Sequence, residues 1–151
     1  YGSFRNNPDL DEELVVRSAQ VHALMPMMQF SVAPWRILSE ENQKICLDMA
    51  KLHSKFGNYI LELAKKASTT GEPIVKPMEL AFPGKGYEVI KDQFVLGDKI
   101  IVAPIIIKNT FTREVILPKG RWVDELGNKY KGDKTVQINV PIERLPYFTK
   151  L

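Results

Sequence analysis

The sequence has few residues of the kinds that build covalent cross-links or metal sites. It contains one cysteine, Cys46, so no disulfide can form within the chain. Cys46 lies in a helical pattern without an evident histidine partner, which favours a buried thiol over a nucleophile. The two histidines, His22 and His53, have no carboxylate or cysteine at metal-ligand spacing. We therefore expect neither a metal site nor a cofactor.

Long apolar runs and clusters of charge are also absent. No apolar run reaches the roughly 18 residues of a membrane-spanning helix, and the polar start, "YGSFRNNPDLDEE", has no hydrophobic region of a signal peptide. The 21 basic and 18 acidic residues are scattered without a lysine–arginine run, which argues against a nucleic-acid or membrane-surface partner. The sequence indicates no compartment. Its 44% of apolar residues is typical of a globular protein with one core or two small cores.

The residues before Gly71 follow a helical period. The first helical stretch, "DLDEELVVRSAQVHAL", opens with Asp11, Glu12 and Glu13. Acidic side chains stabilise the N-terminal end of a helix, and this explains the cluster better than a catalytic role does. The pattern predicts an inward stripe of Leu14, Val15, Ala19 and Leu24.

A second helical stretch begins after Ser39, which is a good N-cap residue. Gly57 interrupts its apolar period, and "NYILELAKKAS" then resumes it. The apolar residues before this break are Ile45, Met49, Leu52 and Phe56. Gly71, with a proline soon after it, supplies the stop signal. The first half of the chain is therefore predicted to be mainly helical.

The residues after Gly71 predict short strands. The stretch "GEPIVKPMELAFPGKG" is broken by proline and glycine, which is typical of an extended connector. Asp92 and Asp98 then frame a strand in "QFVLG". Five β-prone runs are separated by turn residues: "KIIVAPIII", "TREVILP", "GRWVD", "TVQINV" and "LPYFTK". "IIVAPIII" does not alternate, so we expect it to be buried on both faces. Trp122 is expected to pack in the core, and the spacing favours a small antiparallel β-sandwich.

The segment "LMPMMQFSV", residues 24–32, is a solitary apolar and β-prone run between the two helical stretches. Helix, strand, helix is the order of an α/β unit with a parallel sheet. A lone parallel strand cannot satisfy its own backbone groups and needs a neighbour on each side. We expect those neighbours outside this sequence or in a partner chain. Within this chain alone, the apolar face of residues 24–32 should be exposed, disordered or paired with a second copy, which would make the chain prone to self-association.

Five ordered stretches resemble the end of glycoside hydrolase family 31 enzymes. "EELVVRSAQVHALMPMMQFSVAPW" is similar to the family's Glu-Leu-x-x-Arg-Trp-x-Gln followed by Phe-x-Pro-x-x-Arg-x-His. "GEPIVKPMELAFP" and "DQFVLGDKIIVAPIII" resemble its Gly-x-Pro-x-x-Arg-Pro and its Asp-Gln-Phe-x-x-Gly patterns. "REVILPKGRWVDELGNKYKG" and "VPIERLPYFTK" resemble its Leu-Pro-x-Gly-x-Trp-x-Asp and its closing Leu-Pro-x-Phe. Together the matches cover nearly the whole chain in the family's order.

The resemblance implies a fold of class α/β plus all-β. Residues 1–72 would be the C-terminal end of a catalytic (β/α)8 barrel, with its last strand and helices, and residues 73–151 an antiparallel β-sandwich. Family members are retaining α-glycosidases that use two aspartates, a nucleophile and an acid/base, about 5 Å apart. Both aspartates come from earlier strands of the barrel, so neither is in this chain. The implied function is the C-terminal fragment of an enzyme that hydrolyses α-linked oligosaccharides or glycosides, and the fragment should be inactive alone.

The resemblance also supplies candidate substrate-binding residues. Active sites of such barrels lie at the C-terminal ends of the strands. The family's substrate-binding histidine falls on Ser31 and its arginine on Gln29, whereas Ser18 replaces a tryptophan. Trp35 follows the same strand end. A serine hydroxyl is shorter and uncharged, which departs from simple α-glucosidase specificity. The segment is most similar to the subgroup related to the myogenesis-regulating glycosidase, which is associated with α-galactoside hydrolysis.

Other interpretations of the same residues remain open. Gln29 and Ser31 could fill the interior of a barrel without touching sugar. The chain could instead be a non-catalytic carbohydrate-binding or scaffold module, which would show a row of exposed aromatic side chains on a sandwich face. A helical interaction domain with a β appendage would need a heptad pattern, and Gly57 breaks the only long helix.

Overall fold

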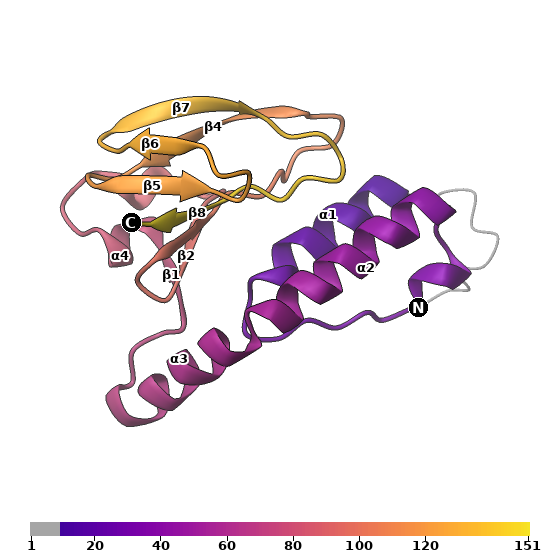
Figure 1. Ribbon diagram of the computed structural model, residues 1–151, viewed down its shortest axis with the longest axis horizontal. Coiled ribbons are helices and arrows are strands. Elements are labelled where there is room, and N and C mark those ends of the chain that lie inside the picture. The colour runs from indigo at the N-terminus through magenta and orange to yellow at the C-terminus, as the bar shows by residue number, and fades with distance from the viewer. Residues whose placement is uncertain (1–9) are drawn as a thin grey trace.

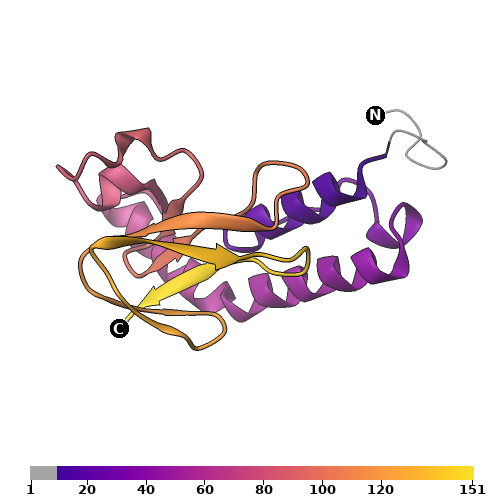
Figure 2. The ribbon, with the colours of Figure 1, turned by 90° about the horizontal axis from the view of Figure 1, so that it is seen from above.

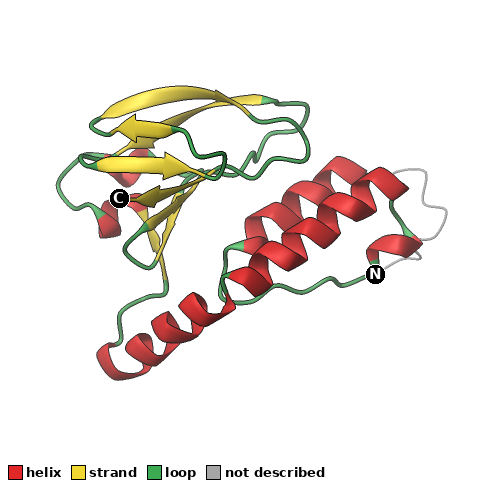
Figure 3. Cartoon of the chain, in the orientation of Figure 1, coloured by secondary structure: helices red, strands yellow, loops and turns green. Residues whose placement is uncertain are grey.

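The helices of the computed structural model, which describes residues 10–151, gather in the first half of the chain (Figure 3). The longest of them are α1 (Glu12–Ala23), α2 (Glu40–Lys55) and α3 (Gly57–Thr70), and a 3-10 turn, η1 (Pro34–Arg36), precedes α2. Helices α1 and α2 pack side by side, and α3 follows α2 along the length of the molecule (Figures 1 and 2). The first nine residues of the region predicted to end a barrel lie outside the described residues.

Local signals fix the helix ends, and those at Ser39 and Gly71 are the predicted ones, whereas Asp11, which was expected in the first helical turn, is the N-cap of α1. The Asp11 carboxylate accepts a hydrogen bond from Leu14 N, and the Ser39 hydroxyl accepts one from Asn42 N, so both residues act as N-caps. Gly71 ends α3 in the left-handed conformation, with φ of 72°. The predicted break in the second helical stretch also occurs, because Phe56 separates α2 from α3.

The inward face of α1 differs from the predicted stripe. Leu14 was expected to face inward but is 66% exposed, whereas Val16 and Ala19 are buried. Arg17 and Gln20 are buried on the same helix. The reason is that these two polar side chains donate hydrogen bonds to backbone carbonyl groups of the strand-forming residues 73–151, which we call the β half. This orientation of α1 turns Leu14 toward the surface.

Within residues 10–151, eight short strands form two antiparallel sheets. The larger has the order β1 (Val75–Pro77), β2 (Phe94–Leu96), β3 (Ile100–Val102), β8 (Tyr147–Lys150), β5 (Arg121–Asp124) and β6 (Lys129–Lys131). The smaller pairs β4 (Thr112–Leu117) with β7 (Lys134–Asn139) over six residues. Each of the five predicted β-prone runs contains one strand, and the strand framed by Asp92 and Asp98 is β2. The connector also holds a short helical turn, α4 (Met78–Ala81), and a second turn, η2 (Tyr87–Val89), follows the connector directly.

The six-stranded sheet is a middle layer, because alternate side chains of its strands enter different cores. Leu96 and Ile100 pack with the helices, whereas Val95 and Ile101 pack with the β4–β7 sheet. This confirms that the run beginning at Ile100 is buried on both faces. The run was expected to stay buried to its end, but the strand stops at Val102, and residues 106–107 are exposed. A proline at position 104 lacks the N–H that would continue the ladder.

Trp122 lies at the centre of the second core, as predicted. Its side chain is fully buried, and its indole N–H donates to the Pro118 carbonyl oxygen at 2.8 Å. The ring meets Phe82 edge-on, with centroids 6.3 Å apart. Over residues 10–151, no helix combines the length and apolar character that a bilayer crossing would require.

Residues 24–32 were predicted to form a strand, and they do not. The segment has no regular secondary structure, although it leaves α1 and leads to η1. A strand is held by hydrogen bonds to a neighbour, and no strand of residues 10–151 lies beside this segment to supply them. The expected exposure is confirmed for Met27, which is 76% exposed, but is wrong for Leu24, which is buried.

Candidate functional site

The segment of residues 28–32 and one face of α1 enclose an open hollow of about 430 Å³. Gln29 and Ser31, two of the three candidate substrate-binding residues, line it together. The α1 side of the hollow includes Val15, Ala19 and Ser18. The structure therefore brings the two candidates to one surface, which the sequence could predict only through the family resemblance.

The side chains of this unpaired segment alternate as those of a strand do. Met27, Gln29 and Ser31 are exposed, whereas Met28 and Phe30 are partly buried and pack against the helical core. Successive side chains of an extended chain point to opposite faces, and alternate residues lie roughly 6.5 Å apart. Gln29 and Ser31 thus share the open face, at a spacing that one sugar ring with its hydroxyl groups can bridge.

The hollow beside α1 offers neutral hydrogen-bonding groups. Of the described residues, none with an aspartate, glutamate, lysine or arginine side chain lines it. The Gln29 amide and the Ser31 hydroxyl can each donate and accept hydrogen bonds. His22 also lines the hollow, and its Nδ1 lies 2.7 Å from the Ser18 carbonyl oxygen. Groups of this kind suit uncharged hydroxyl-rich ligands.

Trp35, the third candidate, lies on a different surface. It belongs to η1, is 74% exposed, and lines a second hollow of about 440 Å³ against α2. Phe30 lines both hollows, and no other described residue does. Cys46 lies at the second hollow but is buried, and burial raises the pKa of its thiol, as expected for an inert side chain. The structure does not bring Trp35 to the surface shared by Gln29 and Ser31.

The acidic residues at the start of α1 all have partners within the chain. Asp11 pairs with Lys108 at 2.8 Å, and this hydrogen bond lowers the pKa of Asp11. Glu12 accepts hydrogen bonds from Ser39 and Asn42, and the bond from Asn42 lowers the pKa of Glu12. Glu13 accepts from a backbone N–H of the loop before β4. Their contacts go beyond the helix-dipole explanation and join α1 to α2 and to the β half.

The two aspartates around β2 also serve structural contacts. Asp92 pairs with Arg113 at 3.0 Å, whereas Asp98 accepts from Lys76 at 2.7 Å and from Lys66 at 3.4 Å. The hydrogen bond from Lys76 lowers the pKa of Asp98. Among residues 10–151, no group of three or more histidine, cysteine, aspartate or glutamate side chains is arranged to hold a metal ion.

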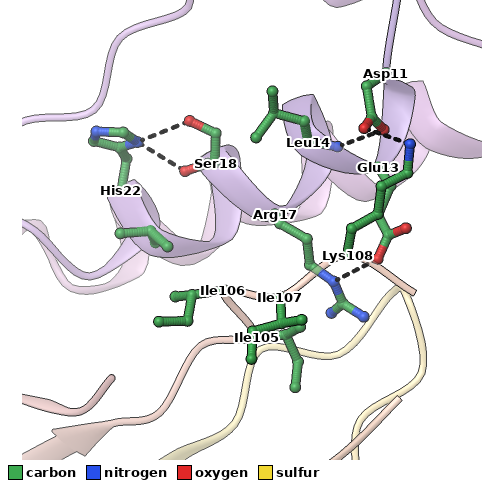
Figure 4. Close-up of a pocket in the computed structure, with 11 residues that line it drawn as sticks. Asp11, Glu13, Leu14, Arg17, Ser18, His22, Ile105, Ile106, Ile107 and Lys108 are labelled. Carbon is green, nitrogen blue, oxygen red and sulfur yellow. Dashed lines mark hydrogen bonds and ion pairs between the residues drawn. The ribbon is translucent and has the colours of Figure 1, made fainter. Parts of the chain in front are cut away.

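A third hollow, of about 370 Å³, separates α1 from the loop of residues 105–108 (Figure 4). Its lining includes Arg17, whose side chain points from α1 toward the β half (Figure 4). Arg17 and Gln20 were not predicted to have a role. The signal was a pair of polar residues, three positions apart, on the same helix as the buried Val16 and Ala19.

Comparison with known proteins identifies the family. Residues 71–151 match the model of the glycosyl hydrolase family 31 C-terminal domain. The chain is 36% identical to mouse myogenesis-regulating glycosidase and 31% identical to a probable glucan 1,3-alpha-glucosidase of Arabidopsis thaliana. These matches cover 96% and 99% of the chain but only 21% and 17% of the relatives, so the chain spans about a fifth of their length.

Solved structures agree with the sequence matches. A Flavobacterium johnsoniae family 31 dextranase in complex with glucose superposes with a TM-score of 0.87 and 30% identity, over 92% of this chain and 18% of that one. A family 31 alpha-xylosidase from a soil metagenome, in complex with xylose, gives a TM-score of 0.86 and 25% identity, over 96% and 25%. The helices and antiparallel sheets described above are therefore shared with these enzymes, and the chain belongs to glycosyl hydrolase family 31.

Proposed function

We propose that this chain is the C-terminal part of a retaining α-glycosidase and supplies one wall of its sugar-binding site. Residues 1–72 would end the catalytic (β/α)8 barrel, with residues 24–32 as its last strand. Residues 73–151 would form the β-sandwich that follows it. The observation that carries the proposal is the strand-like alternation of residues 27–32 without a neighbouring strand, because it leaves Gln29 and Ser31 on an open face.

The chemistry of that face supports a neutral sugar as ligand. Gln29 and Ser31 offer an amide and a hydroxyl, whereas the exposed aromatic ring of Trp35 lies on a different surface. The similar dextranase and alpha-xylosidase structures hold glucose and xylose. Short uncharged side chains at positions 29 and 31 would leave room for a ring substituent, which suits an α-galactoside as well as an α-glucoside.

Hydrolysis should require polypeptide outside these 151 residues. Retaining glycosidases need a pair of carboxylates about 5 Å apart, and the acidic residues described above are engaged in structural contacts. We expect no turnover of 4-nitrophenyl α-galactoside or α-glucoside by this chain, and turnover of one of them by a longer polypeptide that includes it. Turnover by the chain alone, or none by the longer protein on any α-glycoside, would contradict the proposal.

The role of Ser31 can be tested in the longer polypeptide against a matched serine. Ser31→Ala should lower kcat/KM about 2–12-fold, the value of one hydrogen bond of about 0.5–1.5 kcal/mol. Ser18→Ala is the control, because Ser18 lines the same hollow from α1 and bonds locally with His22. Equal losses in both variants would remove the specific assignment of Ser31.

A non-catalytic carbohydrate-binding module remains the alternative, and the exposed Trp35 favours keeping it. Such a module is expected to carry its aromatic row on a sheet face, but Trp122 is fully buried there and Trp35 lies on η1. Calorimetric titration of the 151-residue chain with isomaltotriose separates the two. The proposal expects no measurable heat of binding, and saturable binding would favour the module.

A further inference from the structure

Arg17 is a buried cation that joins α1 to the end of the smaller sheet. It is 5% exposed, and its Nη2 donates to the Thr110 and Val140 carbonyl oxygens, each at 3.3 Å. Its Nη1 donates to the Pro141 carbonyl at 3.4 Å and to Gln20 Oε1 at 3.0 Å. The three backbone carbonyl groups belong to residues just before β4 and just after β7, where the start of β4 pairs with the end of β7.

Gln20, one turn further along α1, extends the same contact. It is fully buried, accepts the hydrogen bond from Arg17, and donates through Nε2 to the Ile142 carbonyl at 2.6 Å. Glu13 adds a carboxylate 3.9 Å from Arg17 Nε (Figure 4). The same carboxylate accepts a hydrogen bond from Asn109 N.

The opposite side of α1 supports the candidate sugar-binding segment. Val15 and Ala19 line the hollow that Gln29 and Ser31 share, and Met28 packs against the same helical core. Helix α1 therefore lies between the carbonyl groups of the β half and the segment of residues 28–32. A shift of α1 relative to the β half would move the backing of that segment.

We propose that Arg17 and Gln20 are positioning residues that hold α1 on the β sheets and thereby set the placement of Gln29 and Ser31. The effect on sugar rests on the function proposed above, whereas the mechanical coupling does not. Apolar packing alone is non-directional. Hydrogen bonds from a planar guanidinium to fixed carbonyl groups define direction and register, and breaking one partner of such a buried set is costly.

Arg113 provides a matched control for Arg17. It is 9% exposed and also donates to backbone carbonyls, those of Asp92 and Pro104 among them. All its partners lie within the β half, so replacing it should cost comparable stability without releasing α1.

Methionine methyl resonances can report the coupling in the 151-residue chain itself. Met28 packs on the helical core, whereas Met78 is buried in the second core. With carbon-13 methyl labelling, Arg17→Leu should shift or broaden the Met28 resonance and leave Met78 in place. Arg113→Leu should shift or broaden the Met78 resonance and leave the Met28 resonance in place. An unchanged Met28 resonance in Arg17→Leu, or equal changes in both variants, would overturn the proposal.

Milder changes keep the test decisive if Arg17→Leu does not fold. Gln20→Leu removes one carbonyl contact and one contact with Arg17, and it should move the Met28 resonance in the same direction. Arg17→Lys should restore part of the wild-type resonance.

In an active longer polypeptide, Arg17→Leu should lower kcat/KM by up to about 100-fold, the loss that a 1 Å misplacement can cause, mainly through KM. Arg17→Lys should recover part of that loss, and Arg113→Leu should leave KM near wild type. If the wild-type protein hydrolyses no α-glycoside, the proposed function fails, and the methyl resonances still decide the coupling.

Discussion

Replacing Asp124 by asparagine should be among the most costly single changes in the β half. The Asp124 side chain, at the end of β5, is fully buried, with an exposed fraction of 0%. Its Oδ1 accepts from the backbone N–H groups of Leu126 and Asn128 at 3.1 and 2.8 Å. Its Oδ2 accepts from Asn128 Nδ2 and the Tyr130 hydroxyl, both at 3.0 Å, and from Arg144 Nη2 at 3.3 Å.

The magnitude follows from what an asparagine can keep. Its amide oxygen can retain the two backbone hydrogen bonds, but its NH₂ group would face three other donors. Two hydrogen bonds from the neutral donors, taken at a lower value of about 1 kcal/mol each, and one ion-pair hydrogen bond from Arg144 of about 1.5–3 kcal/mol would be lost. We therefore expect the free energy of unfolding to fall by about 3–5 kcal/mol, a large part of the 5–15 kcal/mol that is typical of a domain.

Urea unfolding followed by circular dichroism measures this loss. The control is Asp48→Asn, because Asp48 is half exposed on α2 and its only ion pair with a described residue, Lys51 at 4.0 Å, lies on the surface. The control should change the free energy by less than about 0.5 kcal/mol. A loss below about 1 kcal/mol in Asp124→Asn would refute the assignment of its hydrogen bonds.

The same carboxylate should make stability fall in acid. Burial raises the pKa of Asp124, but the hydrogen bonds from Asn128 and Tyr130 outweigh it and hold the pKa below the ordinary 3.8. A group with a depressed folded pKa stabilises the protein above the unfolded pKa, and the contribution is lost as pH falls through the folded pKa. The difference between wild type and Asp124→Asn should therefore narrow below about pH 4. A difference that stays constant into strong acid would contradict this cause.

Three further predictions concern packing, capping and association. Gly132→Ala should cost about 3 kcal/mol by thermal unfolding, since a Cβ there would overlap the Pro118 carbonyl oxygen, a backbone atom; an unchanged melting temperature would contradict it. Ser39→Ala should cost about 1 kcal/mol in urea, because it removes the cap of α2 and a 2.9 Å bond to Glu12; no loss would argue against the cap. The chain should self-associate in light scattering through its exposed apolar side chains, and Met27→Ser should reduce this; a strict monomer would refute it.

The elements that the sequence predicts well are those set by neighbours in the chain. Ser39 and Gly71 mark helix ends because caps depend on a few adjacent residues. The strands β1 and β6 were not predicted. β1 lies in a proline-rich connector and owes its form to pairing with β2, and β6 has the sequence "KYK", which carries no apolar pattern because it lies at the edge of its sheet.

Long-range polar contacts explain the errors at the candidate site. The inward position of Arg17 depends on carbonyl groups 93 to 124 residues away in sequence, which no local period reveals. The burial of Trp122 was predicted from its residue type alone. The buried hydrogen-bond network of Asp124 was not predicted, because one of its five donors, Arg144, comes from a turn 20 residues further along the chain. Ser31 and Gln29 entered as candidates through resemblance to a family pattern, and the structure adds that they share one face.

The structure of a longer polypeptide that contains this chain, solved with a bound α-glycoside or its sugar product, is the most direct test of the proposed sugar wall. We predict that residues 25–32 pair with a strand on each side, with Gln29 or Ser31 within hydrogen-bonding distance of the sugar. A sugar bound without contact to either residue, or a segment that stays unpaired in the longer protein, would contradict the account.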